Sequence, residues 1–434
     1  MIGLGVYFVI FSILMGLAVA IPSLAILTLF FIFPLDQWAL ATSAAYLPGS
    51  TFTNILAGSI VILALIVAAA KHGLQVFNPG PVFWLTLALM FYAFGSIIWT
   101  PVPAKAYSLW ETGVLYILTF CFALPFVLQN TGDITRILKI LVLIGTPFAI
   151  MIVFYLDWGY RAVYVDASIG KFTTNPLALA EFAGFLAIAA ALLRVGGVKW
   201  AVIRVLAILI AGLLILKTGS RGQLIATVLS VAFFYFLSRG RTSIPKLGLA
   251  AILATAFLVI TYMEVGELVQ SEYVLGRQDS RWTEEASTQS YEGRWNNALV
   301  LLAKCQSAIP TIVFGCGNSA SYDPKILGIY PHIVPLEILG EEGIVGFLIY
   351  LAIFWRSVLN VIRATKAHAE DVVLRSEVLA FAAFALFEFL LTLKQGSLLG
   401  SWSSFAFLIL LERLALLSTR PGNLALVLQR QSDR

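Results

Sequence analysis

Hydrophobic residues fall in long runs along almost the whole of this chain, and polar residues are confined to the stretches between them. Runs of about 18 or more apolar residues are typical of helices that cross a lipid bilayer. The alternation of apolar and polar residues that marks a membrane β-barrel is absent from the sequence. The expected spans are Ile2–Ala20, Pro22–Leu40, Ile55–Ala70, Pro81–Trp99, Leu109–Leu128, Ile137–Leu156, Leu177–Leu193, Val202–Leu216, Gln223–Leu237, Leu247–Met263, Ile344–Ile362, Leu379–Leu393 and Ser401–Leu417. The pattern predicts an all-α polytopic membrane protein with about 12 or 13 transmembrane helices.

The uncertainty in this number lies in the first 40 residues. Pro22 and Pro34 are expected to break the first two runs, because proline removes a helical hydrogen bond. Residues 1–40 then form either two short spans or one crossing with a re-entrant piece.

One long segment, Glu264–Glu342, is too polar to lie in lipid, and it carries much of the unusual chemistry. The chain is therefore expected to have three parts: a first bundle of spans (residues 1–263), a large loop (264–342), and further spans with a tail (343–434). Composition agrees, because 60% of the 434 residues are hydrophobic and 12% are charged, with a mean hydropathy of +0.92. A soluble domain carries roughly 25% charged residues.

Lys and Arg alternate between rich and poor loops, which predicts the orientation by the positive-inside rule. The cytoplasmic set is Lys71, Arg136, Lys139, Arg194, Lys199, Arg204, Arg239, Arg241, Lys246, Arg356, Arg363, Lys366, Arg375, Arg420, Arg430 and Arg434. The opposite set comprises Lys105, Arg161, Lys171, Lys217, Arg221, the large loop and Lys394. The C-terminus is thus expected in the cytoplasm and the large loop outside. The net charge of +5 reflects this bias, so it does not indicate binding to nucleic acid.

The orientation singles out one histidine. Of the 3 His residues, His72 and His368 fall on the cytoplasmic side, and His332 alone falls on the outer face. Neutral imidazole is the commonest general base near pH 7. His332 is therefore a candidate catalytic base, with simple packing at a loop–helix junction as the alternative.

Arginines at the outer ends of spans are candidates for binding phosphate. Arg221 follows a turn so short that it must lie near the start of a helix, where backbone N–H groups and a guanidinium converge. Arg161 and Arg294 also lie at span ends or in the large loop. The alternative for each is snorkelling to the membrane interface. Secondary candidates are Lys105, Lys217, Gln223 and Glu337.

Other chemistries have little support. The outer face has one His and scattered carboxylates without metal-ligand spacing, and no phosphate-binding glycine loop of the nucleotide-hydrolase type is present. Cys305 and Cys316 lie in the large loop. They could form a disulfide if the loop faces an oxidising space, or remain as two unpaired residues.

Three stretches together resemble the O-antigen ligase and O-antigen polymerase superfamily. Thr218–Gly222 is similar to its S-R-G motif, and Glu292–Trp295 with Phe314–Asn318 is similar to its G-R…W…P…G-x-G pattern. His332 with Leu336–Gly346 resembles its H-N…L-x-x-L-x-E-x-G-x-x-G. The resemblance runs from about Leu213 to Leu348, whereas the N-terminal half matches in hydropathy alone. Three departures concern contacts to substrate: Ile333 stands where the family has Asn, Pro335 is an additional proline, and Asn318-Ser319 lacks the usual Pro.

The resemblance implies a GT-C-like glycosyltransferase of the bacterial inner membrane, with its active site facing the periplasm. The donor would be a glycan on undecaprenyl pyrophosphate, and the acceptor would be lipid A-core for a ligase. It implies no cofactor and no metal. His332 would act as the base, and Arg221, Arg161 and Arg294 would bind the pyrophosphate. Displacement with one base would invert the anomeric centre, whereas retention would need a carboxylate nucleophile such as Glu337, Glu341 or Asp166.

Two alternatives remain. A polymerase would use the same motifs to extend a lipid-linked glycan, but the single dominant outer loop favours a ligase. A transporter or lipid flippase would explain acids within apolar spans, Glu181 and Glu388. A transporter places its binding groups near the bilayer midplane, whereas His332 and the arginines are expected at the outer rim.

Overall fold

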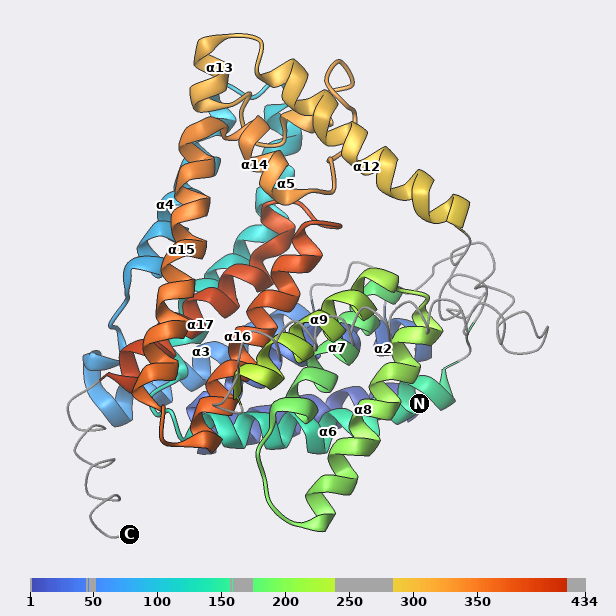
Figure 1. Cartoon of the computed structure of the whole chain (residues 1–434), viewed down its shortest axis with the longest axis vertical. Coiled ribbons are helices and arrows are strands. Elements are labelled where there is room, and N and C mark those ends of the chain that lie inside the picture. Colours follow the sequence, from blue (N-terminus) through green and yellow to red (C-terminus); the bar gives the residue numbers. More distant parts are fainter. Residues whose placement is uncertain are drawn as a thin grey trace. The chain divides into compact units, whose positions relative to one another are not determined.

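The computed structural model describes residues 2–43, 46, 52–156, 158, 175–238 and 284–419, without the side chains of Ile2, Leu74, Gln75 and residues 284–292. The elements in this part of the chain are helices, and none of them is a β-strand. Within the described residues, ten helices are long and apolar enough to cross a membrane. The chain is therefore an all-α, multi-pass membrane protein (Figure 1).

The chain divides into two compact units that are interleaved along the sequence. Unit 1 comprises Met1–Val76, Val127–Ala286 and Ala367–Phe387, and unit 2 comprises Phe77–Phe126, Ser287–Lys366 and Glu388–Arg434. The helices of unit 1 are α1 (Ile2–Ala20), α2 (Leu27–Thr42), α3 (Phe52–His72), α6 (Asp133–Tyr155), α7 (Pro176–Leu192), α8 (Val198–Thr218), α9 (Arg221–Ser238) and the first part of α16 (Val372–Thr392).

Helix α7 forms the core of unit 1, in contact with α2, α6, α8 and α9. Apart from Glu181 its residues are apolar, and most of them are buried, as expected of a helix surrounded by protein. Gly184 allows close packing here, because a Cβ on it would lie 2.5 Å from the ring of Phe387. Asn175 caps the helix by accepting a hydrogen bond from the backbone N–H of Leu177 at 3.0 Å.

Helices α1 and α2 form an antiparallel hairpin. The indole Nε1 of Trp38 donates to the carbonyl of Gly3 at 2.8 Å, so the end of α2 lies beside the start of α1. Pro22 begins the bend between them, a short 3-10 segment (Pro22–Ile26). The expected break at Pro34 is wrong, because this residue lies inside α2. Neighbouring groups can compensate for the hydrogen bond that proline removes from a membrane helix.

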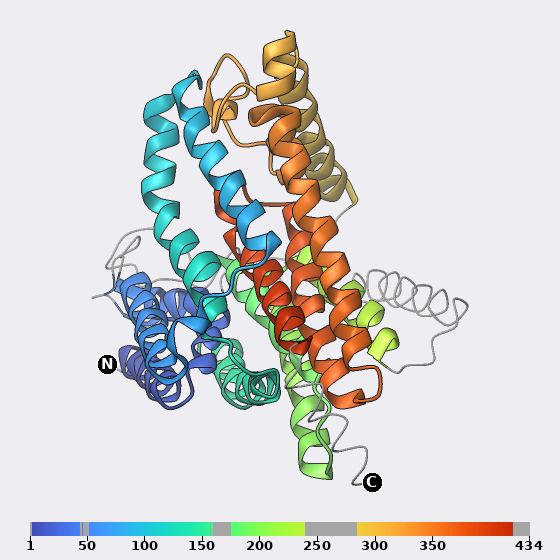
Figure 2. The ribbon, with the colours of Figure 1, turned by 90° about the vertical axis from the view of Figure 1, so that its left-hand side faces the viewer.

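Unit 2 contains α4 (Pro81–Gly95), α5 (Pro103–Tyr116), a π-helical segment (Ile117–Ala123), α12 (Glu284–Cys305), α13 (Ile309–Phe314), α14 (Val334–Glu341), α15 (Gly343–Ala367) and α17 (Trp402–Ser418). Figure 2 shows α4 and α5 side by side in this unit. Helix α17 is its buried core. Its first residue, Trp402, stacks on Tyr116 and Phe120 with ring centroids 5.1 and 4.9 Å apart.

A carboxylate of α17 caps the N-terminus of α4. The two oxygens of Glu412 accept the backbone N–H groups of Val82 at 2.7 Å and Phe83 at 3.0 Å. These N–H groups have no partner within their own helix, and a carboxylate also complements the helix dipole. This contact fixes one end of the α4–α17 pair, and the loops at the other end form the site described below.

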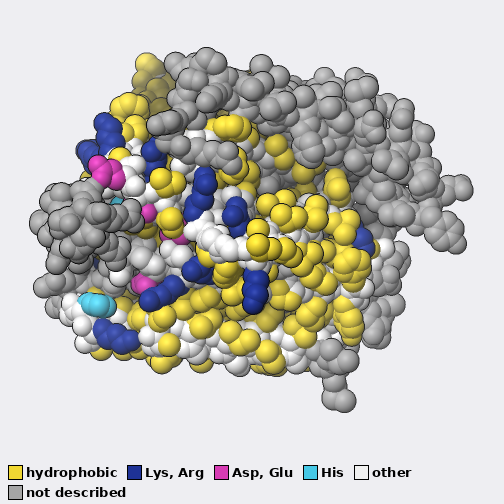
Figure 3. Space-filling view, turned by 60° about the horizontal axis from the view of Figure 1, so that its bottom comes forward, with side chains coloured by type: hydrophobic (Ala, Val, Ile, Leu, Met, Phe, Trp, Pro, Cys, Tyr) yellow, Lys and Arg dark blue, Asp and Glu magenta, His cyan; other side chains and the backbone are white. Residues whose placement is uncertain are grey.

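The predicted spans in the described part of the chain each coincide with a helix. The expected span Leu247–Met263 and the first part of the large loop, residues 264–283, lie outside the described residues. Many large hydrophobic side chains are exposed, including Phe91, Phe154 and Trp355. Figure 3 shows such side chains covering much of one face, interrupted by Lys and Arg. This surface composition fits helices that face lipid.

Candidate functional site

The loops and short helices between α12 and α15 gather at one end of unit 2, and we call them the α12–α14 cap (residues 293–342). Figure 1 shows α13 and α14 near the upper end of α15. The hydroxyl of Tyr92 on α4 donates to the carbonyl of Phe314 at 3.0 Å. The backbone N–H of Asn318 donates to Oγ of Ser96 at 2.8 Å. The cap is thus attached to the end of α4.

Glycines allow two stretches of the cap to cross in direct backbone contact. Gly315 has φ +78°, and a Cβ on it would lie 2.0 Å from the carbonyl oxygen of Glu341. Gly343 has φ +66°, and its Cβ would lie 2.4 Å from the nitrogen of Gly315. The G-x-G stretch and the E-x-G stretch, separate motifs in the sequence, therefore pack against each other. Only glycine fits both the backbone angle and the space.

His332 has an unusual backbone. Its φ is +66°, one of two positive values among the non-glycine residues that the structure describes. The left-handed region costs an L-residue roughly 1–3 kcal/mol, and residues held there are often found at functional sites. The structure places His332 directly before α14, where the tertiary packing must stabilise this conformation.

The imidazole of His332 packs against an aromatic ring and is influenced by a positive charge. Its ring centroid is 4.0 Å from that of Tyr330. Burial and then the positive charge of Arg294 lower the pKa of His332 below its usual 6.5. Burial likewise lowers the pKa of Arg294, but a guanidinium remains charged at any physiological pH. At pH 7 the side chain of His332 is thus mainly neutral and able to accept a proton.

The effect of Arg294 on His332 can be measured directly. We expect Arg294→Gln to raise the pKa of His332, because removing a neighbouring positive charge favours the protonated imidazole. Carbethoxylation of His332, followed by mass spectrometry across pH 5–8, reports the fraction of neutral imidazole. The midpoint should move to higher pH in the variant. Lys304→Gln removes the same charge from α12 and should leave the midpoint in place; an equal shift in both variants would contradict the assignment to Arg294.

Two tyrosines extend the row of rings away from His332. The ring centroids of Tyr322 and Tyr330 are 6.2 Å apart, and Nζ of Lys105 lies 5.0 Å from the centroid of Tyr322. Burial raises the pKa of Tyr330, and burial with the charge of Glu337 raises that of Tyr322 to about 12. Both phenols therefore stay neutral and can donate hydrogen bonds at physiological pH.

Three carboxylates of the cap are buried: Glu337, Glu341 and Glu342. Oε1 of Glu337 accepts the backbone N–H of Leu398 at 3.0 Å, and its Oε2 has no hydrogen-bond partner among the described residues. Oε1 of Glu342 accepts the side-chain amide of Asn318 at 3.1 Å. Burial raises the pKa of Glu341 to about 7 and that of Glu342 to about 8, and it raises that of Glu337 well above the usual value.

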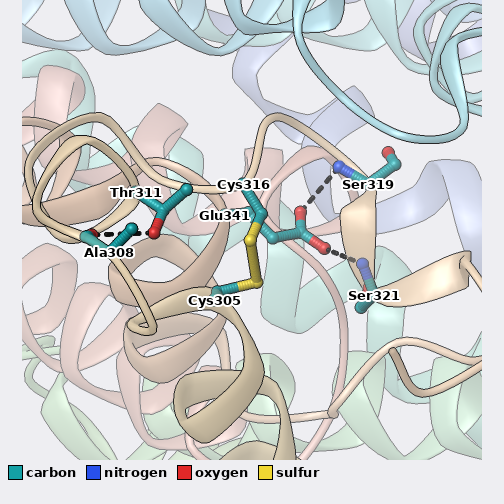
Figure 4. The surroundings of a disulfide bond; sticks show 7 residues. All are labelled: Cys305, Ala308, Thr311, Cys316, Ser319, Ser321 and Glu341. Carbon is teal, nitrogen blue, oxygen red and sulfur yellow. Dashed lines mark hydrogen bonds between the residues drawn. A yellow bond between two sulfur atoms is a disulfide. The ribbon is translucent and has the colours of Figure 1, made fainter. Parts of the chain in front are cut away.

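Glu341 connects the two crossing stretches. Its carboxylate accepts the backbone N–H groups of Ser319 at 2.7 Å and Ser321 at 2.9 Å, as Figure 4 shows. Its own carbonyl accepts the N–H of Gly317 at 2.8 Å. Both carboxylate oxygens are therefore occupied by the loop, which points to a structural role for Glu341.

Cys305 and Cys316 form a disulfide beside this carboxylate (Figure 4), which resolves the alternative that the sequence left open. Their Cα atoms are 5.4 Å apart. Cys305 is the last residue of α12, and Cys316 lies between the two glycines of the G-x-G stretch. The bond thus joins α12 to the loop that Glu341 holds.

Arg221 lies in unit 1, at the first position of α9. Helix α8 ends at Gly219, whose φ of +63° ends the helix in a left-handed turn, and α9 begins two residues later. The prediction that Arg221 lies near a helix N-terminus is therefore confirmed. Arg221 is half-buried, and Gln223, two residues further on, is fully buried. Backbone N–H groups at such a helix start favour an anion.

Lys217 is engaged near the same turn. Its Nζ donates to the carbonyl of Val153 at 2.9 Å and lies 5.8 Å from the ring of Trp158. Because the ammonium group of Lys217 already has these partners within unit 1, Lys217 is a weaker candidate than Arg221 for binding a substrate.

The predicted site residues thus fall into two groups. His332, Arg294, Glu337 and Lys105 belong to unit 2, and there the charge of Arg294 acts on His332. Arg221, Lys217 and Gln223 belong to unit 1. Arg161 and Asp166 lie outside the described residues.

Sequence reasoning did not identify Tyr322 and Tyr330 as neighbours of the site, nor Glu341 and Glu342 as the carboxylates that hold the cap. The sequence could have indicated the role of Glu341 and Glu342, because two consecutive Glu residues next to an apolar run need hydrogen-bond partners within the protein. No comparable signal marks the tyrosines, since aromatic residues at span ends are common.

Comparison of the chain with protein-family models and with curated proteins finds no match. Within the described residues, no group of three or more His, Cys, Asp or Glu side chains is arranged to hold a metal ion.

Proposed function

We propose that this protein is a glycosyltransferase of the bacterial inner membrane that acts as an O-antigen ligase. It would transfer a glycan from undecaprenyl pyrophosphate to a sugar hydroxyl of lipid A-core. The observation that carries the proposal is His332: a half-buried imidazole in a left-handed backbone, packed against Tyr330, with a pKa lowered by burial and by the charge of Arg294. The surrounding motifs resemble those of the ligase and polymerase superfamily, and this resemblance suggests that the base acts in glycosyl transfer.

His332 would remove the proton from the acceptor hydroxyl. The oxygen then attacks the anomeric carbon of the donor as the bond from that carbon to the pyrophosphate oxygen breaks. A base that is neutral at pH 7 suits this step, because a protonated imidazole could not accept the proton. The proton on His332 is afterwards released to water. A single displacement of this kind inverts the anomeric centre.

The leaving pyrophosphate carries developing negative charge, which needs fixed positive partners. Arg294 is supported in this role by the effect of its charge on the base, and Arg221 by its position at a helix N-terminus. Arg161 is proposed for the same role from the sequence alone, because it lies outside the described residues. Tyr322 and Tyr330 present neutral phenols next to His332, and they would contact the hydroxyl groups of a sugar.

We propose that the α12–α14 cap faces the periplasm and that the C-terminus is cytoplasmic. The alternation of Lys and Arg supports this orientation. The Cys305–Cys316 disulfide supports it too, because disulfides persist in the periplasm and are rare in the cytosol. Since α1 and α2 form a hairpin, two crossings by these helices would place the N-terminus on the periplasmic side as well.

Reconstitution of the purified protein tests the function. The protein is mixed with undecaprenyl-pyrophosphate-linked glycan and rough lipopolysaccharide, and the products are separated on a gel. Glycan attached to lipid A-core is the expected result. Longer lipid-linked chains without capped lipopolysaccharide would identify a polymerase instead. If no covalent product forms and lipid moves across the bilayer, the protein is a transporter and not an enzyme.

Arg221 offers a test of how the pyrophosphate is bound. We expect Arg221→Lys to lower the transfer efficiency by roughly 10- to 100-fold, because an ammonium cannot reproduce a bidentate guanidinium contact worth about 1.5–3 kcal/mol per charged hydrogen bond. Arg221→Ala should reduce it further. The measurement is kcat/KM over a range of donor concentrations.

The matched control is Arg363→Lys, the same exchange at an exposed position near the end of α15. It should transfer glycan like the wild type. Full activity of Arg221→Lys would mean that Arg221 acts as a simple charge or has no contact with the donor.

A further inference from the structure

The Cys305–Cys316 disulfide lies within the cap that carries His332, and the transfer mechanism does not use it. Cys305 is fully buried at the end of α12, and Cys316 is half-buried. The backbone N–H of Cys316 donates to the carbonyl of Gly340 at 3.1 Å. The sulfur of α12 is therefore bonded to a residue that is itself fixed against α14.

The bond ties together the two sides of the His332 environment. Arg294 lies on α12, eleven residues before Cys305, which is about three helical turns. His332 directly precedes α14, whose Glu341 holds the loop after Cys316 through Ser319 and Ser321. The disulfide thus anchors the arginine-bearing helix to the element that positions the histidine.

From residue 293 onward, where the side chains are described, helix α12 has few other attachments. Its buried apolar side chains there are Ala298 and Leu301, in line with Cys305, whereas Trp295 and Leu299 are exposed. Leu301 packs on Gly340, where an added Cβ would lie 2.9 Å from Cγ of the leucine. Lys304 near the end of the helix donates to the carbonyl of Lys325. Because so few side chains of α12 are buried, the position of the helix depends on the Cys305–Cys316 disulfide at its C-terminal end.

We propose that the Cys305–Cys316 disulfide is an oxidative modification that fixes α12, and with it Arg294, to the part of the cap that carries His332, so that the site is complete only in the oxidised protein. The partner this requires is a thiol oxidase of the compartment that the cap faces. A thiolate of the chain attacks the oxidase disulfide to form a mixed disulfide, and the second thiolate displaces the oxidase as a dithiol. Two protons and two electrons leave the cysteine pair.

The groups around His332 define a readout that does not depend on catalysis. They are Arg294 from α12 and Tyr330 from the preceding loop, with Glu337 of α14 and Tyr322 acting on Tyr330. Among them, Arg294 is the group whose position depends on α12. Loosening α12 should therefore change the titration of His332 in the same direction as removing the arginine.

The experiment compares the wild type with Cys305→Ser/Cys316→Ser, using carbethoxylation of His332 across pH 5–8. Cys121→Ser is the matched control, because it removes the buried third cysteine from the π-helical segment. We expect a disulfide-linked peptide from the wild type without reductant. The midpoint for His332 should rise in the double variant, as in Arg294→Gln, and stay unchanged in Cys121→Ser.

Combining the double cysteine change with Arg294→Gln should then add no further shift. If the double variant does not accumulate, the wild type reduced and alkylated after purification provides the same comparison. Two free thiols in the folded wild type would overturn the proposal. The proposal would also be overturned if the pH midpoint of His332 rises in Arg294→Gln but stays unchanged in the double cysteine variant or in the reduced wild type. These results stand apart from the proposed transfer reaction, because none of them measures it.

Discussion

Replacing His332 by asparagine should reduce glycan transfer by about 10²- to 10⁴-fold, the usual contribution of a general base. Asparagine removes the proton-accepting imidazole and tolerates the left-handed backbone better than most residues. The fold of the cap should therefore survive, since φ is +66° at this position. Alanine would lose the imidazole and also strain the backbone, so the asparagine variant gives the cleaner comparison.

The measurement is the transfer rate as a function of pH, together with thermal unfolding. For the wild type, the rate should fall as the pH drops through the pKa of His332, which lies below 6.5 because of burial and the Arg294 charge. His332→Asn should lose this acidic limb along with the activity, while unfolding at nearly the same temperature. A variant that keeps its rate and its acidic limb would assign the base to another group.

Gly315→Ala should prevent the α12–α14 cap from forming. An added methyl group would lie 2.0 Å from the carbonyl oxygen of Glu341 and 2.6 Å from the nitrogen of Glu342, and both are backbone atoms that cannot rotate away. The positive φ of +78° adds about 1–2 kcal/mol. The sum should exceed about 4 kcal/mol, in the range of the most destabilising single substitutions. Thermal unfolding and the yield of folded protein measure this effect.

Gly328→Ala separates the two causes. Gly328 has φ +79°, nearly the same as Gly315, but the nearest heavy atom to an added Cβ is 3.8 Å away. This variant should lose only the roughly 1–2 kcal/mol of the backbone angle and keep the cap folded. Equal stability of the two variants would mean that the backbone crossing of Gly315 with Glu341 is not tight.

Parts of the site were predictable because they depend on neighbours in the chain. The turn before Arg221 has a glycine that ends one helix and a start for the next within two residues, so its position at a helix N-terminus follows from local geometry. The choice of His332 depended on charge alternation between loops. Its left-handed backbone was not predictable, because a histidine adopts this conformation only when packing imposes it.

The sequence by itself determined the class of protein and its helices. Apolar runs must be helical in lipid, since every backbone polar group needs a partner within the segment. The sequence predicted a helix break at Pro34, but α2 continues through this residue. Whether a helix continues at a proline depends on the groups that surround it in the folded protein.

Only the tertiary structure decided what meets at the cap. Gly315 touches Gly343, Glu341 accepts the N–H groups of Ser319 and Ser321, and Cys305 bonds to Cys316. The charge of Arg294 acts on His332 from a helix almost 40 residues earlier in the chain. Motifs in the sequence mark each of these stretches separately. Their pairing depends on contacts over long sequence separations, where burial and hydrogen-bond satisfaction, rather than local preference, select the partner.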